Sequence, residues 1–123
     1  MSAMSAFSTG PLENQLDNAG TIAKTVWIKV ENNRSSGNVI VRLRVFRLDG
    51  TRTLIAQAQL IVNPGTSQRR VIPLANNVFE YEVQYDVNRQ GALVSVFSKD
   101  ANGNLVAAQR VLNSEFTPIP QIG

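Results

Sequence analysis

The sequence contains neither cysteine nor histidine. The absence of cysteine excludes disulfide bonds, thiol nucleophiles and zinc sites of the Cys/His type. The absence of histidine removes the side chain that most often moves protons near neutral pH. Only 17% of the 123 residues are charged and 43% are hydrophobic, which favours a buried core over disorder. We therefore expect one folded domain that needs no cofactor and acts on no small-molecule substrate.

Long hydrophobic runs are also missing. No stretch approaches the roughly 18 consecutive apolar residues of a membrane-spanning helix. Residues 1–10 lack the basic and apolar segments of a secretory signal. We expect no membrane span, and a protein that is made and folded in the cytoplasm without a Sec signal.

Apolar and polar residues alternate through much of the chain from residue 24 onward. The clearest alternation covers 79–88, where every odd position is apolar, the pattern of a half-buried strand. Weaker alternation covers 26–31, 39–48 and 54–62, and it slips near Phe46, which indicates a β-bulge. Shorter strand candidates are 67–74, 92–99 and 104–112, the last of which also suits a helix.

Turn-forming residues separate these segments. Asp49-Gly50 and Asn102-Gly103 favour tight hairpins, and Pro73 indicates an edge strand or a strand end. About seven or eight short strands with no long helical segment predict an all-β, antiparallel β-sandwich that is jelly-roll-like. We expect the sandwich to cover 24–112, preceded by an N-terminal connector arm over 1–23 and followed by an extended tail over 113–123.

Candidate catalytic and metal-binding acids are few. Glu80, Glu82 and Asp86 share one face of the predicted strand at 79–88. They could act as an acid–base pair or bind a hard cation, or they could pair with arginines of a neighbouring strand. We favour the second reading, because catalytic carboxylates normally lie in a cleft. The Asp100–Asn104 segment lacks the distal acid of a calcium loop, so the sequence predicts no catalytic residue and no metal site.

Basic residues gather around one predicted hairpin, and the net charge is +3. Arg42 and Arg44 would share a strand face able to contact phosphates. Phe46 is the one nearby aromatic residue, and the acidic strand at 79–88 could neutralise the patch. We therefore favour a neutralised strand face over nucleic-acid binding here.

Trp27 is the single tryptophan, and alternation places it on the face opposite Val26 and Ile28. An exposed tryptophan on a sheet can stack on a sugar or contact a partner protein. The more ordinary interpretation is that another part of the same protein covers it.

The segment 93–112, LVSVFSKDANGNLVAAQRVL, is followed by NSEF at 113–116, and FSTGP occupies 7–11. These segments resemble the sequences of small proteins of spore-forming Gram-positive bacteria. The architecture is also similar to that of endospore appendage subunits, which are jelly-roll domains with a flexible N-terminal connector. Those subunits assemble in the mother cell without a Sec signal and commonly carry connector cysteines, which this chain lacks. The resemblance implies a homo-oligomer or fibre on a spore or cell surface.

An N-terminal arm could join neighbouring copies by adding a strand to a sheet edge. Its plausible anchors are Phe7, Leu12, Leu16 and Ile22. Each buried anchor contributes roughly 1.5–3 kcal/mol, whereas ordering the backbone costs about 1–2 kcal/mol per residue. We therefore expect a structural, self-assembling protein that also needs lateral contacts. The alternative is a non-catalytic binding module, for carbohydrate through Trp27 or for nucleic acid through Arg42 and Arg44.

Overall fold

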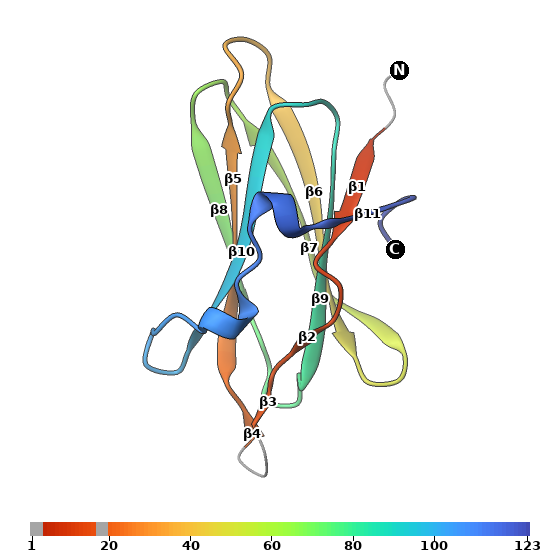
Figure 1. Cartoon of the computed structure of the whole chain (residues 1–123), viewed down its shortest axis with the longest axis vertical. Helices are drawn as coiled ribbons and strands as arrows, with labels where there is room; N and C mark the ends of the chain where they lie inside the picture. Colours follow the sequence, from red (N-terminus) through yellow and green to blue (C-terminus); the bar gives the residue numbers. More distant parts are fainter. Residues whose placement is uncertain (1–3, 17–19) are drawn as a thin grey trace.

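The computed structural model describes residues 4–16 and 20–123, and two antiparallel sheets pack face to face (Figure 1). The larger sheet has the order β11-β1-β9-β6-β7, with β2 also paired to β9, and the smaller sheet has the order β10-β5-β8. A two-stranded ribbon joins β3 to β4. This arrangement confirms the all-β sandwich predicted from the alternation. Among the described residues, helical structure is confined to two short 3₁₀ turns, and no helix there is long and apolar enough to cross a membrane.

The larger sheet consists of β1 (Ser5–Ser8), β2 (Leu12–Glu13), β6 (Val39–Leu48), β7 (Arg52–Val62), β9 (Glu80–Val87) and β11 (Thr117–Ile119). The smaller sheet consists of β5 (Ala23–Asn32), β8 (Ser67–Pro73) and β10 (Ala92–Asp100). The ribbon consists of β3 (Gln15–Leu16) and β4 (Gly20–Thr21), and the 3₁₀ turns are η1 (Ala107–Gln109) and η2 (Asn113–Glu115).

The core lies between the two sheets and is rich in β-branched residues. Val26, Ile28 and Val30 on β5 are fully buried, as are Val39 and Val41 on β6. Their period of two places each buried set on the inner face of its sheet. β-Branched side chains suit this pleated, half-buried surface because their χ1 angles are already restricted.

Local signals in the sequence are confirmed at several points. Gly50 has a φ of +94° in the turn between β6 and β7, a conformation that glycine adopts without steric cost. The pairing of β6 with β7 shifts register between Val45 and Phe46, as the slip in alternation predicted. Pro73 ends β8, which is an edge strand.

The prediction of a strand over 104–112 is wrong. This segment contains η1, and its pairing with β10 consists of two isolated bridges, Val96 with Val111 and Lys99 with Leu105. The physical reason is the spacing of the bridges, which lie three residues apart on β10 and six apart on this segment, so the additional residues leave the strand path and form η1. The side chain of Gln109 in this turn is 1% exposed and hydrogen-bonds in the core.

Both ends of the chain take part in the larger sheet. β1 lies between β9 and β11, pairing Ser5 with Val87 on one side and Ala6 with Ile119 on the other. Figure 1 shows β1 beside β11 at the flank of the larger sheet. The segments expected to form a separate arm and tail, 1–23 and 113–123, therefore supply strands to the same sandwich in this chain.

Candidate functional site

The predicted arm anchors lie on their own domain. Phe7 stacks on Tyr85 with ring centroids 5.1 Å apart, and Leu12 packs against the core opposite Tyr81. Ile22 is half-buried. The backbone of Leu16 pairs with Gly20 in the ribbon, whereas its side chain lies outside the described part of the structure.

A buried polar network fastens this N-terminal segment to the core. Asn14 is fully buried; its Nδ2 donates to the backbone oxygens of Ala23 and Val78, and its Oδ1 accepts from the Ala23 N–H and from Gln109 Nε2. Gln109 Nε2 also donates to the Glu13 carbonyl. All four hydrogen-bonding positions of the Asn14 amide are therefore occupied.

The other end of the Gln109 amide completes the network. Its Oε1 accepts hydrogen bonds of 2.7 Å from both the Tyr81 hydroxyl and the Ser98 hydroxyl. Burial raises the pKa of Tyr81 to about 12, so the phenol remains a neutral donor at physiological pH. We call these residues the Asn14–Gln109 clasp. It joins the N-terminal segment, both sheets and η1.

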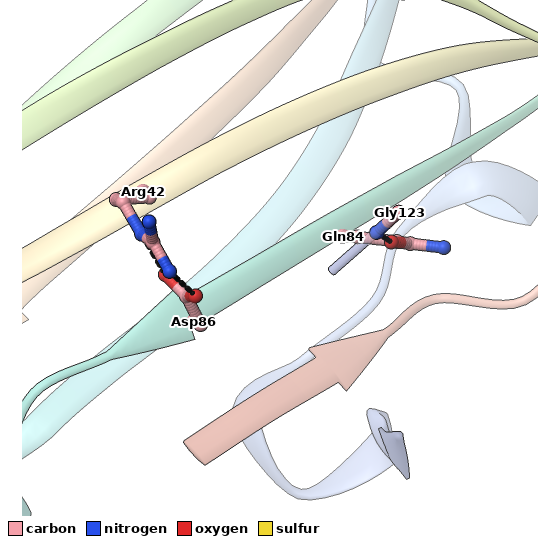
Figure 2. A network of polar contacts seen from close by, with 4 residues as sticks. All are labelled: Arg42, Gln84, Asp86 and Gly123. Atoms are coloured by element: carbon pink, nitrogen blue, oxygen red, sulfur yellow. Dashed lines mark hydrogen bonds and ion pairs between the residues drawn. The ribbon is translucent and has the colours of Figure 1, made fainter. Parts of the chain in front are cut away.

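One of the two arginines considered for phosphate binding, Arg42, is paired with an acid of the neighbouring strand, as the sequence favoured. Arg42 forms a two-pronged ion pair with the buried Asp86 on the neighbouring β9, with Nε donating to Oδ1 at 2.9 Å (Figure 2). This contact raises the pKa of Arg42 further above its usual value. Arg44 is half-buried and lines a shallow hollow together with Arg42 and Ile122. The structure therefore brings Arg42 and Arg44 to one hollow, with the charge of Arg42 paired to Asp86.

Two of the acids on β9, Glu82 and Asp86, have separate structural partners. Asp86 pairs with Arg42, as favoured from the sequence, and Glu82 Oε2 accepts hydrogen bonds from Ser8 Oγ and Gln84 Nε2. Gln84 Oε1 also accepts from the Gly123 N–H at 2.7 Å (Figure 2). Among the described residues, no group of three or more acids could hold a metal ion.

Trp27 lies on the outward side of the smaller sheet. Phe97 stacks beside its ring at 5.8 Å, the Arg69 guanidinium lies 5.0 Å from the ring centroid, and Lys99 Nζ lies 3.9 Å from it. The indole N–H donates to Thr25 Oγ1 at 3.0 Å. In the part of the chain that the structure describes, the tryptophan is therefore partly covered by neighbouring side chains of its own sheet.

This side of the sheet carries more positive than negative charge. Alternate residues of β5, β8 and β10 face outward because their neighbours are buried in the core. The charged residues at these outward positions are Lys29, Arg69, Lys99 and a single acid, Glu31. We call the surface around Trp27, Phe97 and the three cations the Trp27 face.

An apolar pocket of about 220 Å³ adjoins the Trp27 face. Its walls include Phe97, Leu105, Arg110 and Leu112. Leu105 is 66% exposed and Leu112 is 43% exposed. The bridges from β10 to the 105–111 segment place this pocket on the opposite side of β10 from Trp27.

A second candidate surface is the free edge of the larger sheet at β7. Within residues 4–16 and 20–123, β7 pairs with a strand on one side only, namely β6. Residues 53–62 contain no charged residue and no proline, and Leu54 and Ile61 are each nearly half exposed. We call this strand side the β7 edge.

Sequence reasoning missed the clasp and most of the Trp27 face. Nothing in the sequence around Asn14 or Gln109 indicates that these side chains are buried. Their hydrogen-bond partners lie far away in the chain, so each amide resembles an ordinary exposed polar residue. Phe97 and Lys99 could have been linked to Trp27 by pairing 25–30 with 94–99, since both segments alternate in phase.

The comparisons with known proteins inform the fold alone. No family model and no curated protein matches the sequence. A crystal structure of Thermotoga maritima 1070 superposes on 96% of this chain and 94% of its own, with a TM-score of 0.53 and 9% sequence identity. At that identity the match supports the sandwich architecture.

Proposed function

We propose that the protein is a structural, self-assembling subunit, and that the β7 edge is its principal contact with a second copy. The observation that carries the proposal is the contrast between this edge and the other edges of the sandwich. An exposed, uncharged edge strand presents unpaired N–H and C=O groups that template pairing with another chain.

The other edges are protected by devices that natural sheets use against edge pairing. β11 is three residues long and contains Pro118. β8 carries Arg69 and Arg70 and ends in Pro73. β10 is covered by the 105–111 segment. Short length, proline, charge and a covering loop each discourage the addition of a strand.

Along 53–62 the β7 edge has neither charge nor proline, and its bulge at Ile55 leaves 56–62 regularly paired with β6. The Ile61 carbonyl accepts a 2.7 Å hydrogen bond from Gln68 Nε2, outside the pairing with β6, so that carbonyl points away from β6. Residues two apart in a strand share this direction, which leaves the backbone groups of Gln57 and Gln59 directed outward. A second strand can therefore hydrogen-bond to an already ordered edge.

The preformed edge supports assembly more strongly than a free arm would. Each backbone hydrogen bond contributes roughly 0.5–1.5 kcal/mol, and β7 is already fixed, so the ordering cost of about 1–2 kcal/mol per residue does not arise. Two β7 edges that pair antiparallel about a twofold axis form a closed dimer. A fibre needs a second, different contact.

Exchange of β1 between copies is our proposal for that second contact. In its own chain β1 pairs with β9 on one side and with β11 on the other. The β1 strand of a neighbouring copy, inserted at the same position, would make the same contacts. Phe7 and Leu12 would then anchor a neighbour, as the sequence led us to expect. The resemblance of 93–112 to spore proteins suggests a spore or cell surface as the place of assembly.

Replacing Gln59 with proline tests the β7 edge. Proline removes an N–H that points away from β6, so the domain keeps its own sheet and loses a contact to the partner. We expect the wild type to dimerise in sedimentation equilibrium, and Gln59→Pro to weaken dimerisation about a hundredfold or more. Ile61→Lys, which charges the same edge, should also weaken it, whereas Gln59→Thr should not.

Circular dichroism and thermal unfolding of each variant check that the sandwich is intact. A wild type that stays monomeric at millimolar concentration would overturn the proposal. So would a folded Gln59→Pro variant that dimerises as strongly as the wild type.

A further inference from the structure

We propose that the Trp27 face binds single-stranded nucleic acid, with phosphates on Lys29, Arg69 and Lys99 and a base against Phe97. This site lies on the smaller sheet, whereas the β7 edge belongs to the larger one. The inference is therefore independent of self-assembly. It also concerns a different face from the arginine hairpin considered from the sequence.

Two cations of the Trp27 face, Arg69 and Lys99, lie against the same ring without acidic partners. Within the described residues neither Arg69 nor Lys99 forms an ion pair, and both lie against the Trp27 ring. The cation–π contact already restrains each flexible side chain. Binding a phosphate therefore loses less side-chain entropy. Positive groups so arranged repel one another, and an anion between them relieves that repulsion.

The arrangement disfavours a neutral sugar on Trp27. Stacking a sugar on the indole would displace the Arg69 or Lys99 head group from the ring and offer it no charged acceptor. A phosphate, in contrast, accepts charge-assisted hydrogen bonds from both cations.

Phe97 and the adjoining pocket distinguish a nucleic acid from other polyanions. Trp27 covers one side of Phe97, and the pocket with Leu105 and Leu112 lies on the other. An unpaired base has the flat apolar surface that stacks on such a ring, while Arg110 at the pocket wall can contact its edge or phosphate. Polyphosphate or an acidic polysaccharide would use the cations and leave this pocket unused.

The fluorescence of Trp27 provides a direct measurement, since it is the only tryptophan. On titration with a single-stranded oligothymidylate, we expect saturable quenching. The logarithm of affinity should fall with the logarithm of salt concentration with a slope of about −2, as for three phosphates on a single strand. Inorganic polyphosphate and heparin serve as base-free competitors, and thymidine monophosphate tests whether a free nucleotide suffices.

Two variants separate the charged and apolar parts of the site. Arg69→Gln/Lys99→Gln should weaken oligothymidylate binding at least tenfold, whereas Arg44→Gln/Arg89→Gln, with the same loss of charge, should change it less than twofold. Phe97→Leu keeps the pocket apolar and should weaken binding of the oligonucleotide about fivefold, with no effect on polyphosphate. Thermal unfolding confirms that each variant is folded.

Three results would overturn the proposal. The first is an oligothymidylate affinity that Arg69→Gln/Lys99→Gln does not change. The second is binding without any change in Trp27 fluorescence. The third is equal affinity for polyphosphate together with no effect of Phe97→Leu, which would identify a general anion surface.

Discussion

Asn14→Ala is expected to lose about 3–5 kcal/mol of unfolding free energy, a large share of the 5–15 kcal/mol typical of a domain. The substitution leaves the Ala23 N–H and one Gln109 N–H buried without an acceptor. Each such group costs roughly 1–3 kcal/mol, and loss of the Val78 contact adds to this. Urea unfolding followed by the fluorescence of Trp27 measures the change.

The exposed Asn33 provides a matched control, and Asn33→Ala should change the stability by less than about 0.5 kcal/mol. Asn14→Ala/Gln109→Ala should lose less than the sum of the two single changes, because the two amides share a hydrogen bond. Equal stability of Asn14→Ala and the wild type would show that the clasp does not hold the N-terminal segment.

Alkaline unfolding is the second large effect we expect. Tyr81 and Tyr85 are the only tyrosines, and burial raises the pKa of each to about 12. The unfolded chain loses these protons near pH 10, so it binds fewer protons than the folded chain between pH 10 and 12. Stability therefore falls as the pH rises through that window, by roughly 2–4 kcal/mol for the pair after allowing for some hydration of each hydroxyl.

Tyrosinate absorbance at alkaline pH, recorded together with circular dichroism, tests this prediction. Both signals should change in a single transition above pH 10. Tyr85→Phe keeps the ring stack on Phe7 and Phe116 and removes one titrating group, so its transition should move to higher pH. A tyrosinate signal with a midpoint near pH 10 in a chain that retains its β-sheet spectrum would contradict the assignment.

Much of the fold could be predicted because alternation is a local property. The segment 79–88 alternates strictly, and it forms β9 over Glu80–Val87. Alternation tells which side chains share a face, but it does not tell which strand lies alongside. Arg42 could therefore be placed on an outward face, whereas its pairing with Asp86 depends on the β6–β9 register.

The ends of the chain could not be predicted for a related reason. β1 and β11 are only four and three residues long, too short for a clear period. Their strand geometry comes from the neighbours they meet, since β1 is hydrogen-bonded on both sides. Residues 1–23 and 113–123 thus look irregular in sequence and become ordered only through tertiary pairing.

The pairing of β1 with β9 and β11 also sets an order for folding during synthesis. β1 is made well before either of its partners, because β9 and β11 lie far later in the chain. Non-local pairing of this kind slows folding, and the unpaired side of β9 in a growing chain is exposed to other chains. Copies in which β9 has formed and β11 has not are thus most open to mutual pairing, so synthesis rate and local concentration would influence whether β1 closes its own sheet or a neighbour's.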